Sequence, residues 1–249
     1  MLTAVEMGMK NHEFVPLPLI ENLAALNRSN TYKVVNFLLK HKLVFHTGKN
    51  YSGYALTYQG YDYLAMKVFM KRGHLKKVIC QIGVGKESDI YICESGDKLD
   101  EEGNLVHKGE HVVIKFARLG RTSFRTVKQN RDYLKGRSAN WLYLSRIASL
   151  KEFAFMQALH KRDFPTPTPI DANRHAIVMS LVKAYPMSHI KGLGDSEAVY
   201  KRLIELIITF AEHGLVHGDF NEFNLMINEQ EEVTVIDFPQ MTSTGHPNA

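Results

Sequence analysis

The chain contains little cysteine and no long apolar run. Its only cysteines among 249 residues are Cys80 and Cys93, which are too few for a disulfide framework or a four-ligand zinc site. It also lacks a signal peptide and any run of about 18 apolar residues that would cross a membrane. We therefore expect an intracellular protein with reduced thiols and no membrane contact.

Extremes of composition are absent as well. Hydrophobic residues make up 45% of the chain, charged residues 23% and aromatic residues 10%, which is typical of a globular protein and not of a disordered one. A chain of 249 residues exceeds the usual domain of about 100 to 200 residues. We therefore expect two lobes, or one large core with a smaller module.

Basic residues are in modest excess, with a formal net charge of +5, which permits contact with nucleic acid without requiring it. The stretch 118–146 has a single acid, Asp132, whereas residues 94–110 are rich in acids. The basic residues of the stretch are Arg118, Arg121, Arg125, Lys128, Arg131, Lys135, Arg137 and Arg146. The stretch is either a polyanion-facing surface or a solvated loop, and we interpret the acidic segment as an exposed connector between strands.

The first part of the chain, residues 1–73, predicts two short helices, a hairpin and a third helix. The segment "VPLPLIENLAAL" opens the first helix with Pro18 in its first turn, and Ser29 or Asn30 caps the second helix. The inward stripes of the two helices are Leu19, Ile20, Leu23 and Leu26, then Tyr32, Val35, Leu38 and Leu39. Two β-type runs in "LVFHTGKNYSGYALT" form the hairpin, and residues 59–69 form an aromatic helix.

This order of helices and hairpin is typical of a winged helix-turn-helix domain. In that interpretation Asn30, Tyr32 and Lys33 on the second helix, with Lys49 in the hairpin turn, contact a phosphate backbone or a groove. A module that docks a protein, or that packs inside the molecule, fits the same pattern equally well. The sequence leaves the two interpretations open.

The second part, residues 74–182, predicts a twisted antiparallel sheet with one inserted helix. Its first two strands flank a glycine turn formed by Gly83, Val84, Gly85, Lys86, Glu87 and Ser88. A Walker A loop is excluded because Cys80 and Glu87 stand where it needs glycine and serine or threonine. A dinucleotide fingerprint is excluded because a strand follows where it needs a helix. The turn is either an ordinary hairpin turn or one that lays backbone N–H groups over ATP phosphates, as in kinase folds.

A lysine and a glutamate favour the second interpretation of the turn. Lys115 ends the strand "VVIK" about 30 residues after the turn, where a kinase places the lysine that holds the α and β phosphates. Glu152 shares a helical stripe with Ala148, Phe155, Met156 and Leu159. A carboxylate on an apolar face needs a counter-charge, and Lys115 would supply it. The alternative is that Glu152 lies at the edge of the stripe and extends to water.

The third part, residues 183–249, opens with a helix capped near Asp195 that ends at Gly214. Its inward stripe is Leu203, Leu206, Ile207, Phe210 and Ala211. His213 and His217 follow at the four-residue spacing of a zincin, but Gly214 replaces the glutamate that such a site needs. We interpret both histidines as ordinary polar residues.

Three acidic or amide residues follow in "HGDFNEFNLMINEQEEVTVIDF". Asp219 and Asn224 have the Asp-x-x-x-x-Asn spacing of a kinase catalytic loop. The runs "LMI" and "VTVID" predict a hairpin that places Asp237 at a strand end facing the same pocket. Phosphoryl transfer requires mainly positioning and charge neutralisation. Asp219 would accept or orient the proton of the attacking hydroxyl or water, Asn224 and Asp237 would bind Mg²⁺, and Lys115 would hold the phosphates of ATP.

With these residues in place, the chain resembles the RIO kinases, an atypical protein-kinase family, and within it the Rio-two branch. The segments "GYDYLA", "GVGKESDIY", "LGRTSFRTVK", "HGDFNEFN" and "IDFPQM" carry the resemblance, which covers nearly the whole sequence. It implies an α+β fold in which a bilobal protein-kinase-like domain follows a winged helix-turn-helix domain. Residues 1–73 would form the winged helix, 74–182 the small lobe, and 183–249 part of the large lobe, whose closing helices would lie outside this chain.

The resemblance also implies roles for particular residues. Lys115 and Glu152 would form the ion pair, Asp219 would be the catalytic aspartate, and Asn224 and Asp237 would be the metal ligands. The backbone of Ser180 and Val182 would hold adenine next to Met179. The protein would act in the cytoplasm, with passage through the nucleus, in maturation of the small ribosomal subunit, where it would contact pre-ribosomal RNA and proteins.

More than one function fits these residues. Gly218 stands where ordinary kinases carry arginine, and no activation loop is visible. In the RIO family the position of Asp237 is proposed to accept phosphate itself, which makes an ATPase with an aspartyl-phosphate intermediate a further hypothesis. A small-molecule phosphotransferase, and a nonenzymatic scaffold that binds RNA or the pre-ribosome, compete with the kinase and the ATPase.

Overall fold

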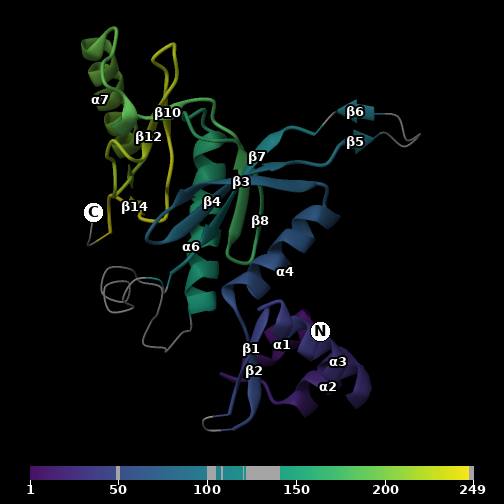
Figure 1. Ribbon diagram of the computed structural model, residues 1–249. Coiled ribbons are helices and arrows are strands. Elements are labelled where there is room, and N and C mark those ends of the chain that lie inside the picture. Colours follow the sequence, from purple (N-terminus) through teal and green to yellow (C-terminus); the bar gives the residue numbers. More distant parts are fainter. Residues whose placement is uncertain (49–50, 100–104, 108, 120, 122–140, 247–249) are drawn as a thin grey trace. The chain divides into compact units, whose positions relative to one another are not determined.

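The computed structural model describes residues 1–48, 51–99, 105–107, 109–119, 121 and 141–246. The chain divides into two compact units, Met1–Arg72 and Gly73–Ala249 (Figure 1). Helices and a mainly antiparallel sheet are both present, so the predicted α+β class is confirmed. Among the described residues, no helix is both long enough and apolar enough to cross a membrane.

The described residues of the N-terminal unit form four helices and one hairpin. The helices are α1 Leu2–Gly8, α2 Leu17–Ala24, α3 Arg28–Lys40 and α4 Tyr58–Lys71, and the strands are β1 Val44–Thr47 and β2 Gly53–Leu56. The predicted hairpin and aromatic helix are confirmed, with Val44 opposite Leu56 in the antiparallel register. Helix α1 was not predicted. It adds buried Leu2, Ala4 and Val5 to the core.

Two details of this unit differ from the prediction. The cap of α3 is Asn27, whose side chain accepts a hydrogen bond from the Asn30 N–H at 2.9 Å, and not Ser29 or Asn30. The inward stripes are narrower than predicted, because only Ile20 is buried in α2 and Tyr32 in α3 is 56% exposed. Short helices bury one or two residues per turn, so periodicity alone overestimates the buried stripe.

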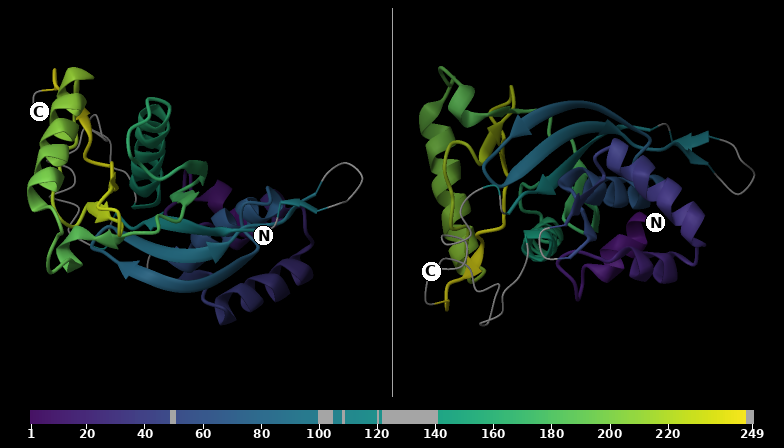
Figure 2. Two further views of the ribbon diagram at one scale, coloured as in Figure 1. Left: turned by 90° about the horizontal axis from the view of Figure 1, so that it is seen from above. Right: turned by 60° about the horizontal axis from the view of Figure 1, so that its bottom comes forward.

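The sheet of the second unit is built from five antiparallel strands in the order β3-β4-β7-β9-β8. These strands are β3 Lys77–Val84, β4 Ser88–Glu94, β7 His111–Ala117, β9 Ala176–Ser180 and β8 Pro169–Asn173. Helix α6, Trp141–His160, is the predicted inserted helix, and it packs against one face of the sheet along β7, β8 and β9 (Figure 2). Between β4 and β7, β5 Lys98–Leu99 and β6 Leu105–His107 pair as a short ribbon, while residues 100–104 and 108 of the acidic segment lie outside the described residues.

The C-terminal segment begins with β10 Tyr185–Pro186, a short 3₁₀ turn η1 Met187–His189, and α7 Ser196–Glu212. It continues with β11 Leu215–Val216, β12 Leu225–Ile227, β13 Val233–Val235 and β14 Thr242–Ser243. The predicted cap is confirmed, because Asp195 accepts from the Ala198 N–H at 2.9 Å. The predicted inward stripe of α7 is wrong in part: Phe210 is buried, but Ile207 is 44% exposed.

One apolar core joins the sheet, α6 and the C-terminal segment. Its buried members include Val113, Met156, Phe164, Ile177, Phe210, Leu225, Val235 and Phe238. Phe164 and Phe210 stack with ring centroids 4.9 Å apart. Because this core is continuous, it holds strand β7, helix α6 and the β12–β13 hairpin in fixed positions next to one another.

The cap of α3 gives a test of the N-terminal unit. Asn27→Ala removes the acceptor of the Asn30 N–H, and we expect the free energy of unfolding of this unit to fall by about 1 kcal/mol. Ser29→Ala changes the residue that the sequence suggested as the cap, and it should change the free energy by less than about 0.5 kcal/mol. Urea denaturation followed by circular dichroism measures both. Equal losses in the two variants would show that Asn27 is not the cap.

Candidate active site

A buried lysine lies between two carboxylates at the centre of the second unit. Lys115 is paired within the sheet to Ile90 and Ile177, and its side chain is only 9% exposed. Its Nζ lies 2.5 Å from Glu152 Oε1 and 2.5 Å from Asp237 Oδ1. The predicted contact of Lys115 with Glu152 therefore forms. Strand β7 continues to Ala117, so Lys115 lies inside the strand and not at its end.

The helical glutamate does not extend to water. Glu152 is 4% exposed on the buried face of α6, so the alternative of a solvated glutamate at the edge of the stripe is wrong. Burial and the charge of Asp237 both raise the pKa of Glu152, while Lys115 opposes them. Burial by itself would lower the pKa of Lys115, but the two carboxylates outweigh it and raise that pKa above its ordinary value. The two carboxylates therefore favour the protonated, cationic form of Lys115.

Asp237 reaches the lysine from a strained turn after the β12–β13 hairpin. The predicted hairpin is confirmed, with Leu225 opposite Val235. Asp237 has φ of +70°, in the left-handed region that a non-glycine residue adopts only at a cost of about 1–2 kcal/mol. The Ile236 N–H donates to the Asn224 carbonyl at 3.0 Å, and Phe238 is fully buried. These contacts on either side hold Asp237 in the strained conformation, and such strain is concentrated at functional sites.

The second group of polar side chains surrounds Asp219. The Asn224 amide donates to Asp219 Oδ2 at 2.8 Å and to its carbonyl at 2.9 Å. The Asn221 amide donates to the other carboxylate oxygen, Oδ1, at 2.8 Å. Both oxygens of Asp219 are therefore oriented by amides. The motif spacing identified Asp219 and Asn224 but gave no signal for Asn221.

The local backbone explains why glycine occupies position 218 in "HGD". Gly218 has φ of +81°, and a Cβ at this position would lie 2.7 Å from the Gln240 carbonyl oxygen. Any side chain would require the backbone to move, and a positive φ disfavours every residue with a Cβ. An arginine is therefore excluded at this position by the local geometry.

His217 connects the two groups of polar residues. It is 4% exposed, its Nε2 lies 3.3 Å from the Ile236 carbonyl, and its Nδ1 lies 3.3 Å from the Asp219 backbone nitrogen. This arrangement suits one neutral tautomer, in which Nε2–H donates and Nδ1 accepts. Burial lowers the pKa of His217, against the opposing effect of the Ile236 carbonyl. The sequence interpretation of His217 as an ordinary polar residue is wrong, while His213 is exposed as expected.

The glycine turn and the segment after β9 are the remaining predicted contacts for a nucleotide. In the turn, the Gly85 N–H donates to the Ser88 carbonyl at 2.8 Å, and Val84 and Lys86 are exposed. After β9, the Ser180 N–H donates to the Thr168 carbonyl at 2.9 Å. The Ser180 N–H is therefore already used within the protein. The Ser180 carbonyl is the backbone group that could accept a hydrogen bond from the amino group of an adenine. Met179 is buried next to it.

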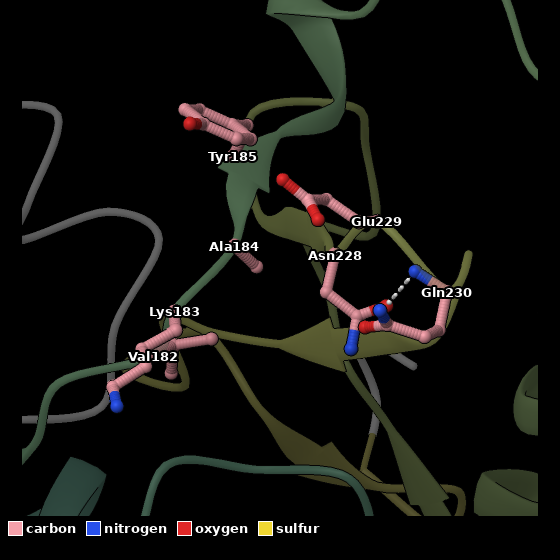
Figure 3. Close-up of a pocket in the computed structure, with 7 residues that line it drawn as sticks. All are labelled: Val182, Lys183, Ala184, Tyr185, Asn228, Glu229 and Gln230. Atoms are coloured by element: carbon pink, nitrogen blue, oxygen red, sulfur yellow. Dashed lines mark hydrogen bonds between the residues drawn. The ribbon is translucent and has the colours of Figure 1, made fainter.

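Val182 also lines a cavity of about 420 Å³. The other lining residues are Lys183, Ala184, Tyr185, Asn228, Glu229 and Gln230 (Figure 3). They come from the segment after β9 and from the turn between β12 and β13. The lining includes neither the lysine with its carboxylates nor Asp219, so we do not assign the reaction to this cavity.

Two arginines at the start of the basic stretch bind an internal carboxylate. Arg118 is buried, and its Nε donates to Asp89 at 2.7 Å; Arg121 donates to both oxygens of the same carboxylate at 2.8 and 2.7 Å. The interpretation as a solvated loop is therefore wrong for Arg118, whereas Arg121 is exposed although it binds the same internal carboxylate. Arg146 is exposed, and the basic residues between 122 and 140 lie outside the described residues.

The fold and the site together define the class of kinase-like folds: a five-stranded sheet with a buried lysine, a helix with its glutamate, a loop with an aspartate and an asparagine, and a second aspartate after the next hairpin. Comparison with protein families agrees. Residues 89–249 match the RIO domain, and residues 1–72 match the family described as Rio2, N-terminal. The chain belongs to the RIO kinase family, in its Rio2 branch.

Individual relatives support this membership. The chain is 56% identical to serine/threonine-protein kinase rio2 of Dictyostelium discoideum, over all of this chain but only 46% of that protein. It is 48% identical to rio2 of Schizosaccharomyces pombe, over all of this chain and 70% of that protein. The Rio2 kinase from Chaetomium thermophilum, solved as an ADP/Mg²⁺-phosphoaspartate complex, is 48% identical with a TM-score of 0.82, over all of this chain and 74% of that one.

The buried histidine predicts a pH dependence of stability. Because the pKa of His217 is lowered on folding, the unfolded chain binds the proton more readily than the folded chain below about pH 6.5. The contribution of neutral His217 to the free energy of unfolding is therefore fully present above that pH. It decreases as the pH falls, by at most about 1.4 kcal/mol per pH unit for this one proton. Melting temperatures at pH 7, 6 and 5 should fall less steeply in His217→Gln than in the wild type. The exposed His213→Gln is the control, and identical slopes in all three proteins would contradict the assignment.

Proposed function

We propose that this chain binds ATP with Mg²⁺ and transfers its γ-phosphoryl group, as an atypical serine/threonine protein kinase or as an ATPase. The observation that carries the proposal is the buried contact of Lys115 with Glu152 and Asp237. A buried cation between two carboxylates, next to a glycine turn, is the arrangement that positions phosphates in kinase folds. The kinase names of the relatives and the ADP and Mg²⁺ in the Chaetomium thermophilum structure support it.

The chemistry of the donor atoms fits a magnesium ion. Asn224 donates through its amide nitrogen to Asp219, so its amide oxygen points away from Asp219. Asn224 directly precedes the β12–β13 hairpin, and Asp237 follows that hairpin. Mg²⁺ binds through one or two such hard oxygen atoms and completes its shell with water and substrate phosphate. Bound there, the ion would neutralise phosphate charge. Asn224 and Asp237 would hold it, and Lys115 would orient the phosphates.

Asp219 is suited to position the attacking group. Asn221 and Asn224 fix both of its oxygens, so the carboxylate has a defined direction. It would accept the proton of the acceptor hydroxyl, or of water, as the oxygen attacks the γ-phosphorus and the bond to ADP breaks. Positioning of this kind is most of what the protein contributes to phosphoryl transfer.

A second candidate is an ATPase that passes through an aspartyl-phosphate. The phosphoaspartate in the Chaetomium thermophilum structure favours it, and in this chain the strained Asp237 is the carboxylate next to the lysine. A carboxylate oxygen of Asp237 would attack the γ-phosphorus while ADP leaves. Water would then attack the phosphorus of the acyl phosphate, which releases inorganic phosphate and restores the carboxylate.

Turnover of γ-labelled ATP with Mg²⁺ distinguishes these candidates. We expect Asp219→Ala to lower turnover by about 10²- to 10⁴-fold. Label on the protein that hydroxylamine removes, and that Asp237→Ala abolishes, would establish the aspartyl-phosphate route. Acid-stable label on serine or threonine would instead establish the protein-kinase route. Glu212→Ala, at the exposed end of α7, should behave as the wild type.

A failure of the proposal would also be visible. If the wild-type protein binds ATP but neither releases ADP nor transfers label, the nonenzymatic scaffold is the hypothesis that remains. Rapid transfer to a small alcohol or amine would indicate the small-molecule phosphotransferase, although membership of the Rio2 branch argues against it.

We further propose that the protein acts in the cytoplasm, after passage through the nucleus, on the pre-ribosomal small subunit, with the N-terminal unit in contact with its RNA. Helix α3 supports this because Asn30, Tyr32 and Lys33 are all exposed on its surface. Exposed aromatic and cationic side chains suit stacking on bases and contact with phosphates. Lys49 lies outside the described residues.

Salt-dependent RNA binding tests this contact. Lys33→Ala should weaken binding of a small-subunit rRNA fragment and reduce the slope of log K against log salt by about 1. Lys67→Ala, which removes an exposed lysine from α4, is the matched control and should leave the slope unchanged. A slope that is the same in both variants and the wild type would exclude this face of α3.

A further inference from the structure

Two arginines and one aspartate form an ion cluster beside the glycine turn. Asp89, the second residue of β4, is buried and accepts from Arg118 Nε at 2.7 Å and from both Nη atoms of Arg121 at 2.8 and 2.7 Å. Burial raises the pKa of the Asp89 carboxyl, but the hydrogen bonds and charges of the arginines outweigh it and hold that pKa below its usual value. The cluster is therefore ionised at neutral pH, with two cations and one anion.

The same segment holds both ends of the turn. Arg121 Nη1 donates to the Gly85 carbonyl at 2.8 Å, and the backbone N–H of Arg118 donates to the Glu87 carbonyl at 2.6 Å. Arg118 is fixed in turn by a contact of 3.2 Å between its Nη1 and His175 Nε2, and by the Phe116 ring, whose centroid is 5.2 Å from its guanidinium carbon. The N–H of Arg121 donates to the Arg118 carbonyl at 3.1 Å, which keeps both arginines in one turn.

These contacts set the direction of a backbone donor. The Gly85 carbonyl and the Lys86 N–H belong to one planar trans peptide, so they point in opposite directions. A guanidinium that holds the Gly85 carbonyl therefore aims the Lys86 N–H away from the cluster. Glycine has no Cβ and adopts many backbone conformations, so without this contact the peptide could rotate and turn its oxygen toward the phosphates.

We propose that Arg121 is a positioning residue for the phosphates of the nucleotide: it binds Asp89 and the Gly85 carbonyl together and thereby keeps the Lys86 N–H directed at the anion. This inference rests on the proposed function, because it assigns the turn to phosphate binding. Arg118 supports the same turn from its other end.

Arg121→Ala tests the proposal through binding. Its side chain is 38% exposed, so its loss is less damaging to folding than loss of the buried Arg118. We expect the Kd for Mg-ATP to rise about tenfold, the factor that corresponds to about 1.4 kcal/mol. The Kd for adenosine, which has the purine and ribose but no phosphate, should remain within about twofold of the wild-type value. Isothermal titration calorimetry of the full chain measures both ligands.

Matched variants separate positioning from general destabilisation. Arg162→Ala removes another exposed arginine that donates to a backbone carbonyl, that of Ala158 at 3.1 Å, and it should leave both Kd values unchanged. Arg121→Lys keeps the charge but loses the fork that binds two oxygens and a carbonyl together, so its Kd for Mg-ATP should lie between those of Arg121→Ala and the wild type. If Arg121→Ala does not fold, Arg121→Lys carries the test.

The outcomes have distinct meanings. Equal Kd values for Mg-ATP in Arg121→Ala and the wild type would overturn the positioning role, as would a parallel loss of adenosine binding. A wild-type chain that binds no Mg-ATP at all would instead overturn the proposed function. A selective loss of Mg-ATP binding that lysine partly restores would establish the role of Arg121.

Discussion

The site depends on one buried cation shared by two carboxylates. Lys115 is fixed by strand β7, Glu152 by helix α6 and Asp237 by the turn after β13, so three distant parts of the sequence meet at one nitrogen. Removing one member of a buried ion pair costs about 3–5 kcal/mol, because the remaining charge is left without a partner in a low-dielectric region. The contact therefore fixes the C-terminal hairpin relative to the sheet. The continuous apolar core holds the same elements together through packing, which has no preferred direction.

The sequence predicted the residues whose signal is local. Asp219 and Asn224 were identified by a five-residue spacing, and Glu152 by its place on an apolar helical stripe. The hairpin that carries Asp237 was predicted from two short β-type runs, and the structure has it. Each of these inferences needs only the neighbouring residues and the geometry of one element.

The inferences that failed concern residues whose partners are distant. His217 has a defined role because Ile236 lies beside it, and Arg121 because Asp89, 32 residues earlier, does. Spacing contains no information on such contacts. Helical periodicity also gives the direction of a face without showing what covers it, which is why Tyr32 and Ile207 are exposed although both lie on predicted inward stripes. The cap of α3 was misplaced by two or three residues because Asn27, Ser29 and Asn30 are all good capping residues.

The register of β7 separates two charge clusters. Lys115 with Glu152 and Asp237 has one excess negative charge, whereas Asp89 with Arg118 and Arg121 has one excess positive charge. Lys115 lies opposite Ile90 in the sheet, and Asp89 lies opposite Phe116. Because neighbouring residues of a strand point to opposite faces, Lys115 and Asp89 lie on opposite faces of the sheet. The carboxylates beside Lys115 can therefore act on a ligand at that site directly, whereas the arginines beside Asp89 can act on it only through the backbone of the glycine turn that they hold.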